Sequence, residues 1–244
     1  MNTLEQRRKL FSHERPDIIY AVGDVHGCFD LLVSLQRKIL DDASQQQGSK
    51  WIVMLGDYVD RGPKSSEVIN ELMTPMSGNI ERFCLAGNHE QIMLDFFNEP
   101  RSDHIWLQFG GIETLQSYGI EQLPEDMKTL KTLLDEKVPR EHISFMASLP
   151  SLLAVPGFCF VHAGVVNGVP LQRQEDRHLL WIRPKEQTKP GSDNLFLTVH
   201  GHTPVRTVSL SDNRLNVDTG AFMTGRLSAV RITRSGDISV MHAE

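Results

Sequence analysis

Five short polar motifs hold the residues of this chain whose types and spacing are best suited to chemistry. Each motif combines glycine or alanine with aspartate, asparagine or histidine. In chain order they are Gly23-Asp24-Val25-His26-Gly27, Gly56-Asp57-Tyr58-Val59-Asp60-Arg61-Gly62, Gly87-Asn88-His89-Glu90, His162-Ala163-Gly164 and His200-Gly201-His202-Thr203. Carboxylate, amide and imidazole groups without thiolates suit Mn²⁺, Fe or Zn²⁺. Two such ions about 3.5–4 Å apart can share a hydroxide as nucleophile and stabilise the charge that develops when a phosphate ester is cleaved.

Six residues of these motifs are candidate metal ligands. Asp24 and His26 stand two positions apart, so both can face the same side of an extended or turning segment, and with Asp57 they could hold one metal. A second metal could take its ligands from Asp57, as the bridge between the two ions, and from Asn88, His162 and His202. His200 stands two residues before His202, and we expect it to support or pack against the site rather than to bind metal.

Each motif follows a short apolar run rich in β-branched residues, which is typical of a buried strand. The runs cover residues 18–22, 51–55, 82–86, 158–161 and 195–199. A glycine followed by a polar residue at a strand end lets the backbone turn sharply and directs the polar group off the edge of the sheet. We therefore expect five strand ends to deliver their ligands to one place.

The ordered set of motifs resembles that of the metal-dependent phosphoprotein phosphatase family of calcineurin-like metallophosphoesterases. Within it, the compact bacterial and phage-type Ser/Thr and Tyr phosphatases are the most similar members. The motifs span residues 23–203, most of the chain. The resemblance implies a four-layer αββα sandwich of two mixed sheets flanked by helices. It also implies two divalent metal ions, Mn²⁺ before Fe or Zn²⁺, and direct attack of a hydroxide that bridges them, without a phosphoenzyme.

The resemblance also implies roles for individual residues. His89 resembles the general acid of the family and Asp60 the carboxylate that holds it. Arg61 resembles a phosphate-clamping arginine, and Asn88 is implied to contact the phosphate in addition to its metal. Arg183 resembles the second phosphate clamp of the phage-type members, although an ordinary surface or stacking role stays open for it. The ligand roles of the other motif residues agree with those argued above.

The substrate class stays open between two kinds of phosphate ester. A Ser/Thr phosphoprotein is expected first, and phosphotyrosine and small phosphomonoesters are also compatible. The alternative is a dinucleoside tetraphosphate or nucleotide hydrolase. Symmetrical hydrolases of that kind typically have alanine where Asp60 stands and aspartate where Glu90 stands, and they lack Thr203-Pro204. A catalytically silent metal-binding scaffold is the remote alternative, which the pair of Asp60 and His89 disfavours because a silent protein needs no proton donor.

Apolar periodicity predicts the elements that position these motifs. Strands are expected at 18–23, 51–56 and 82–86, with helices at about 28–43, from Pro63 to about Pro75, and at 89–97. Such alternation favours parallel βαβ units. Residues 101–150 predict a helical insert that caps or borders the site. The remaining strands are expected at 152–155, 158–162, 195–200, 205–210, 214–218, 227–232 and 237–241.

Length and composition limit the classes of protein to consider. The 244 residues fit one domain over residues 17–244, preceded by a polar lead-in at 1–16. No apolar run approaches the roughly 18 residues of a membrane span, and no secretion signal begins the chain. The net charge of −6, without a basic stripe, disfavours extended nucleic-acid binding. Three widely spaced cysteines form no disulfide or zinc pattern, so we expect a reducing, cytoplasmic location.

Overall fold

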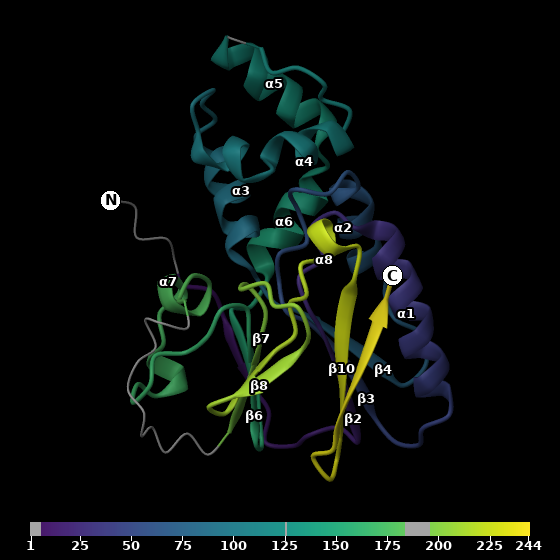
Figure 1. The fold of residues 1–244 in the computed structure, drawn as a ribbon. Coiled ribbons are helices and arrows are strands. Elements are labelled where there is room, and N and C mark those ends of the chain that lie inside the picture. The colour runs from purple at the N-terminus through teal and green to yellow at the C-terminus, as the bar shows by residue number, and fades with distance from the viewer. Residues whose placement is uncertain (1–5, 125, 184–195) are drawn as a thin grey trace.

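The computed structural model describes residues 6–124, 126–183 and 196–244. Two mixed sheets lie face to face, and helices cover them (Figure 1). One sheet has the strand order β11-β10-β2-β3-β4, and the other has the order β1-β5-β6-β7-β9-β8. The sandwich of two mixed sheets with flanking helices confirms the predicted fold class.

The five-stranded sheet carries the first three motifs. Its strands are β2 (Ile18–Val22), β3 (Lys50–Met54), β4 (Ile80–Cys84), β10 (Leu227–Thr233) and β11 (Ile238–Ala243). β2, β3 and β4 are mutually parallel, whereas β10 pairs antiparallel with β2. The crossover helices are α1 (Phe29–Ser44) and α2 (Ser65–Met73). The expected βαβ units are therefore present, and their motifs follow the carboxyl ends of parallel strands.

Both faces of β2 are buried, which explains its continuous apolar sequence. Successive side chains of a strand point to opposite faces of the sheet. Tyr20 and Val22 accordingly belong to the core beneath the helices, with Leu35 of α1. Ile19 and Ala21 belong to the core between the two sheets. This double coverage fixes the register of β2 and, with it, the position of the motif that follows.

The six-stranded sheet carries the last two motifs. Its strands are β1 (Lys9–Phe11), β5 (Leu152–Val155), β6 (Phe158–Val161), β7 (Leu197–His200), β8 (Ser209–Ser211) and β9 (Arg214–Asn216). Phe160, Val199 and Leu215 belong to the core shared with the facing sheet. Because β6 and β7 run parallel, the motifs that follow them emerge at the same edge.

A helical part rises above the two sheets (Figure 1). It consists of α3 (Asn88–Asn98), the 3₁₀ helix η1 (Ile105–Phe109), α4 (Gly111–Ser117), α5 (Met127–Lys137) and α6 (Arg140–Ser148). The last four elements confirm the predicted helical character of residues 101–150. Shorter helical turns are η2 (Leu171–Arg173), α7 (Asp176–Leu179) and α8 (Ala221–Thr224). None of these three turns was expected from the sequence.

Two expected segments differ in the structure. Within the polar lead-in expected at 1–16, residues 9–11 form the strand β1, which pairs with β5. Three residues are too few to show a strand periodicity in the sequence. Arg7, just before it, donates hydrogen bonds to Gln91 of α3 and to the carbonyls of Met146 and Leu149 at the end of α6. The strand expected at 205–210 is limited to 209–211. Residue 195, the start of another expected strand, lies outside the described residues.

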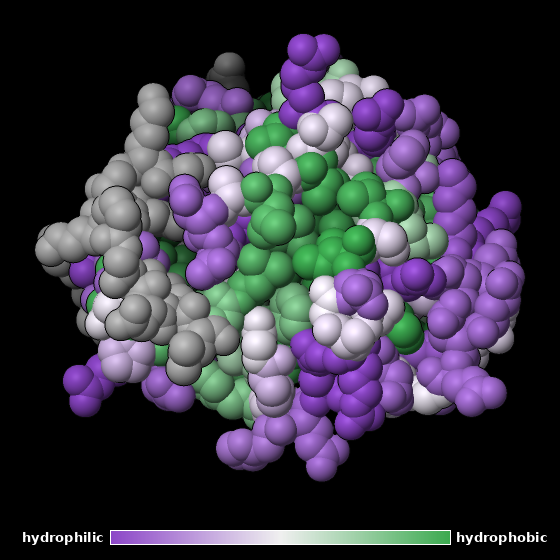
Figure 2. Space-filling model, turned by 60° about the horizontal axis from the view of Figure 1, so that its bottom comes forward, coloured by the Kyte–Doolittle hydropathy of each residue, from purple (hydrophilic) through white to green (hydrophobic). Residues whose placement is uncertain are grey.

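The surface is uneven in polarity. Seen from below, apolar residues gather in the middle of the face and hydrophilic ones surround them (Figure 2). Across the described ranges, no helix combines the length and the apolar character needed to cross a membrane.

Candidate metal centre

The five motifs meet at one edge of the sandwich, where backbone hydrogen bonds join the first two loops. The amides of Val25 and His26 both donate to the carbonyl of Asp57, at 3.0 and 2.8 Å. Five motif residues other than glycine have a positive φ: His26, Asp57, Asp60, Arg61 and His202. Such conformations are costly for residues with a Cβ and cluster at functional sites. The loops therefore hold their side chains at the expense of backbone strain.

Asp57 stands at the centre of the site. Its Oδ2 lies 3.3 Å from Nε2 of His162, 3.5 Å from Nε2 of His26 and 3.9 Å from Nε2 of His89. Two groups of potential ligand atoms converge here, one from His26, Asp57 and His89, the other from Asp57, His162 and His202. Asp57 belongs to both groups, as expected of a residue that bridges two ions.

Potential ligand atoms crowd together at the second group. Oδ1 of Asn88 lies 2.9 Å from both Nε2 of His162 and Nδ1 of His202, and these two nitrogens are 3.2 Å apart. The other ring nitrogen of His202, Nε2, is buried without a hydrogen-bond partner in the described part of the chain. A cation satisfies lone pairs that converge in this way, so the donor set fits a metal ion.

Two of the three histidines proposed as ligands have the neutral charge that this fit requires. Burial lowers the pKa of His26 and of His202 to about 3, which leaves both rings neutral, as metal ligands must be. Burial also lowers the pKa of His162, but the carboxylate of Asp57 outweighs it and raises the pKa to about 10. The protein therefore stabilises positive charge between His162 and Asp57.

Asp24 borders the same cluster from another side. Its carboxylate accepts the backbone N–H of His202, at 3.0 and 3.2 Å to the two oxygens. A Cβ on Gly201 would lie 2.0 Å from Oδ1 of Asp24, so the close approach requires glycine. Burial and the carboxylate of Asp218 raise the pKa of Asp24 well above its ordinary value. A neighbouring cation would favour the ionised form that this environment disfavours. Among the described residues, the first convergent group contains His89 rather than Asp24.

His89 and Asp60 form a buried ion pair beside the first group. Nδ1 of His89 lies 2.6 Å from Oδ2 of Asp60. Asp60 has no exposed surface and also accepts hydrogen bonds from the indole N–H of Trp106 and the hydroxyl of Thr114. Burial lowers the pKa of His89, but the charges of Asp57 and Asp60 outweigh it, so its pKa lies above the ordinary value. The pair can therefore hold a proton on His89.

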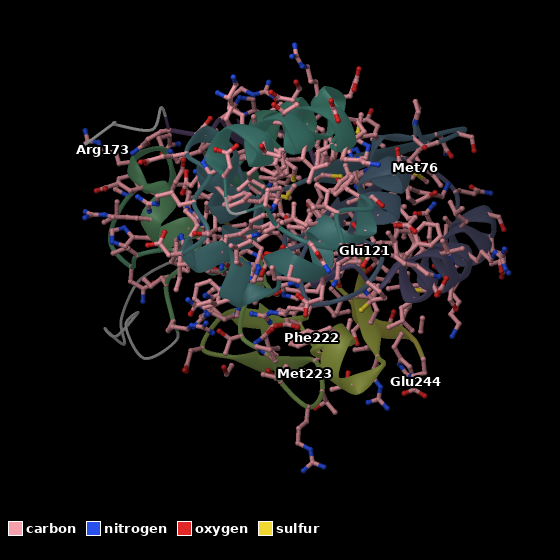
Figure 3. The ribbon with its side chains drawn as sticks, turned by 90° about the horizontal axis from the view of Figure 1, so that it is seen from above. Met76, Glu121, Arg173, Phe222, Met223 and Glu244 are labelled. Carbon is pink, nitrogen blue, oxygen red and sulfur yellow. The ribbon has the colours of Figure 1, made fainter. Side chains whose placement is uncertain are left out.

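The two candidate phosphate-binding arginines differ in their surroundings. Arg61 places Nη2 3.2 Å from Nε2 of His89, and its guanidinium lies over the ring of Phe222, 4.6 Å from the centroid. Phe222 and its neighbour Met223 lie next to each other at α8, as Figure 3 shows. Arg183 is exposed, and its Nη1 donates to the carbonyl of His202 at 3.2 Å. Both arginines thus border the cluster, Arg61 on the side of His89 and Arg183 on the side of His202.

Glu90 is a residue whose role sequence reasoning missed. Its fully buried carboxylate accepts the backbone N–H groups of Gly87, Asp57, Tyr58 and Val59. It thereby shapes the loop after β3 and the start of α3. A glutamate three residues after the N-cap is a recognised capping position. The sequence therefore held a signal for its contact at the start of α3, but none for its contacts with the loop after β3.

Trp106, Thr114 and Phe222 were also missed, because each reaches the site from a distant segment. His200, which was expected to support or pack against the site, is buried, and so is Asp218. Nδ1 of His200 lies 3.0 Å from the carbonyl of Gly201, and its Nε2 lies 3.0 Å from Nη2 of Arg214. Its contacts are therefore outside the two convergent groups.

Comparisons with known proteins agree with this geometry. A family model described as calcineurin-like phosphoesterase matches residues 18–230. The chain is 29% identical over 224 residues to serine/threonine-protein phosphatase 1 of Salmonella typhimurium, with 88% of this chain and 91% of that protein covered. It is 23% identical over 238 residues to the asymmetrical bis(5'-nucleosyl)-tetraphosphatase PrpE of Bacillus velezensis, with 90% of each covered.

Solved structures share the fold. The cold-active protein-tyrosine phosphatase of a psychrophilic Shewanella species superimposes with a TM-score of 0.61 at 18% identity. The match covers 96% of this chain and 83% of that one. The tyrosine phosphatase therefore has the same overall architecture as this chain. The two sequence relatives, which differ in the substrates that they are named for, match it over about nine tenths of their length.

Proposed function

This chain belongs to the calcineurin-like phosphoesterase family, and from that premise we propose that it is a metal-dependent phosphomonoesterase that dephosphorylates proteins. Phosphoserine and phosphothreonine would be its main substrates, and phosphotyrosine a further one. The nucleotide hydrolases among its relatives make a dinucleoside tetraphosphate the competing substrate.

The convergent side chains would supply two positions for divalent ions. Asp24, His26 and Asp57 would hold the first ion. The ligands of the second would be Asp57, Asn88, His162 and His202. Two bound ions would lower the pKa of a water molecule that they bind and would offset the negative charge of the phosphoryl oxygens. Mn²⁺ is the ion that we propose first, and Fe or Zn²⁺ suit the same oxygen and nitrogen ligands.

Arginines are proposed to orient the phosphoryl group. A guanidinium matches two phosphate oxygens with two parallel N–H groups. Arg61 is held beside His89 by its contact with Phe222, so a phosphate bound by Arg61 would place its leaving oxygen near the imidazole. Arg183 would bind the phosphate from the side of His202, and Asn88 would contribute its amide group.

The buried pair of Asp60 and His89 is the observation that carries the proposal. The leaving group of a phosphoserine is an alkoxide, which leaves poorly unless it gains a proton as the P–O bond breaks. The leaving group of a nucleoside polyphosphate is a phosphate, which is stable as an anion without that proton. A cationic imidazole held by a carboxylate is therefore most useful to an enzyme that acts on alkyl phosphomonoesters.

The test combines a substrate panel with one variant. We expect the Mn²⁺-loaded protein to turn over a phosphoserine peptide with a higher kcat/KM than any dinucleoside tetraphosphate. His89→Asn should lower kcat/KM for the phosphoserine peptide by about 10²–10⁴-fold. It should lower kcat/KM less for p-nitrophenyl phosphate, whose leaving group needs no proton. A preference of tenfold or more for the tetraphosphate would instead assign the protein to the nucleotide hydrolases.

A further inference from the structure

The carboxylate of Asp60 is held by two side chains that come from the helical insert. The indole Nε1 of Trp106 donates to both oxygens, each at 3.0 Å, and the hydroxyl of Thr114 donates to Oδ1 at 2.7 Å. His89 takes Oδ2 at 2.6 Å. Each oxygen therefore has two donors, which leaves the carboxylate one orientation that satisfies all of its partners.

The insert also fixes the backbone on both sides of that carboxylate. The amide of Asp60 donates to the hydroxyl of Thr114 at 2.8 Å, and the amide of Arg61 donates to the carbonyl of Gly110 at 3.3 Å. Gly110 has a φ of +106°, and a Cβ there would lie 2.4 Å from the amide nitrogen of Arg61. The turn between η1 and α4 is thus packed directly against the loop that follows β3.

Trp106 links this contact to the packing of the helical part. Its ring has no exposed surface and lies 4.8 Å from the ring of Phe96, on α3, measured between centroids. Because α3 begins with Asn88 and His89, Trp106 contacts the helix that carries the imidazole of His89. It also contacts the carboxylate of Asp60, which orients that imidazole. The insert therefore holds two of the parts whose relative position matters for proton donation.

We propose that Trp106 and Thr114 are positioning residues for the proton donor, acting on His89 through Asp60. The inference rests on the proposed role of His89 as the acid that protonates the leaving oxygen. The hydrogen bonds from Trp106 and Thr114 prevent the carboxylate from turning away from Nδ1 of His89, so the opposite nitrogen, Nε2, keeps its direction toward Asp57 and Arg61. A displacement of the insert would release Asp60 and disorient the imidazole without removing a metal ligand.

Two variants keep most of the volume and remove a side-chain donor to the Asp60 carboxylate: Trp106→Phe and Thr114→Val, the second of which also removes the acceptor of the Asp60 amide. We expect each to lower kcat/KM for a phosphoserine peptide by about tenfold, part of the range that a general acid contributes. The loss on p-nitrophenyl phosphate should be several times smaller, and the metal content should not change. Thr114→Ser keeps the hydroxyl that Thr114→Val removes, so it should retain most of the activity. This comparison stays informative even if Trp106→Phe fails to fold.

Matched controls come from the same residue types elsewhere in the chain. Trp51→Phe changes a tryptophan that packs against Phe83 on the five-stranded sheet. Thr132→Val removes a hydroxyl on α5 that donates to the carbonyl of Lys128. Neither residue contacts Asp60, so neither control should change the ratio of the two substrates.

A double-mutant cycle separates positioning from general destabilisation. In the background of His89→Asn, the change Trp106→Phe or Thr114→Val should cause no further loss on phosphoserine, because the group through which they act is gone. An undiminished further loss, or equal losses on the two esters in the single variants, would overturn the inference.

His89→Asn serves as the test of the proposed function itself. If His89→Asn lost equal activity on phosphoserine and on p-nitrophenyl phosphate, both the acid role and the inference would be overturned. If His89→Asn lost activity only on phosphoserine, and Trp106→Phe and Thr114→Val showed no such loss, the inference alone would be overturned.

Discussion

Asp57 is the side chain on which both candidate metal positions depend. Its Oδ2 lies within 4 Å of imidazole nitrogens from three different motifs. Its Oδ1 accepts the backbone N–H of His89 at 3.1 Å, which ties the carboxylate to the start of α3. Replacing the carboxylate with an amide removes a negative charge that two cations would share, while the shape of the side chain is preserved.

We therefore predict that Asp57→Asn weakens the binding of both metals. The loss in affinity should be roughly tenfold or more for each ion, because even residues that only support a ligand contribute 10–100-fold. Metal content after dialysis against limiting Mn²⁺ measures the effect. Asp135→Asn, a change at an exposed position on α5, is the matched control. Retention of two equivalents of metal by Asp57→Asn would contradict the bridging role.

Arg61 offers a second prediction at the scale of single residues. Arg61→Ala should lower kcat/KM by about 10²-fold, the order found when one hydrogen-bond donor to a developing negative charge is removed. Both metals should stay bound, because the guanidinium contacts His89 and Phe222 rather than the shared carboxylate. Arg37→Ala, at an exposed position of α1, is the control for the change in charge. Loss of metal from Arg61→Ala would show that the arginine acts on the cluster instead of on the substrate.

At the scale of elements, the loop after β3 depends on Glu90 at the start of α3. One buried carboxylate accepts four backbone N–H groups, two at each oxygen. This arrangement holds the loop in the conformation that presents Asp57 and Asp60, both of which have a positive φ. The helix and the loop therefore form one unit, although Asn88 lies 28 positions after Asp60 and the whole of α2 and β4 comes between them.

Glu90→Gln tests this unit with a change of only one atom type. The amide nitrogen that replaces one oxygen would face two N–H donors, which would lose their acceptor. We expect a decrease of about 1–3 kcal/mol in the free energy of unfolding, the cost of leaving buried polar groups unpaired. Urea denaturation of the metal-free protein measures it, and Glu136→Gln at an exposed position is the control. An unchanged free energy of unfolding would show that water or another group replaces the carboxylate.

At the scale of the whole molecule, the candidate metal positions join the two sheets. Asp24, Asp57 and Asn88 follow strands of the five-stranded sheet, whereas His162 and His202 follow strands of the other. Ions bound between them would cross-link the halves of the sandwich in the native state only. Ligands that bind the native state and not the unfolded chain increase the stability of the fold.

Metal removal should therefore lower both activity and thermal stability. At a free metal concentration 100-fold above Kd, one site contributes about 2.7 kcal/mol. For a chain of this size each kcal/mol corresponds to about 2–4 °C in Tm. Chelator treatment should abolish phosphatase activity and lower Tm by roughly 5–10 °C per site, and added Mn²⁺ should restore both. Chelator already saturated with Mn²⁺ is the control. Full activity in metal-stripped protein would refute a two-metal mechanism.

Local sequence was sufficient to predict most of the strands and the order of the motifs, because buried parallel strands have continuous apolar runs and glycine–polar turns at their ends, and the resemblance carried by those motifs implied the sandwich. Ile18–Val22 and its motif illustrate this, since both signals lie within ten residues. The rule that parallel strands end at the same edge places Asp57 near Asn88 and His162 near His202, whereas the meeting of the two pairs depends on how the sheets pack. The roles of these residues as ligands remain predictions.

Only the tertiary structure decided which distant side chains support the site. Trp106 and Thr114 lie 46 and 54 positions from the aspartate that they hold, and Phe222 reaches Arg61 from α8 near the end of the chain. No periodicity or spacing encodes such contacts, because they depend on how the helical part and the two sheets pack against one another. The short strand β1 has the same cause: its pairing with β5 comes from a partner far along the chain rather than from its own three residues. Sequence thus determines the elements and the chemistry at their ends, whereas the packing of those elements determines how each reacting group is oriented.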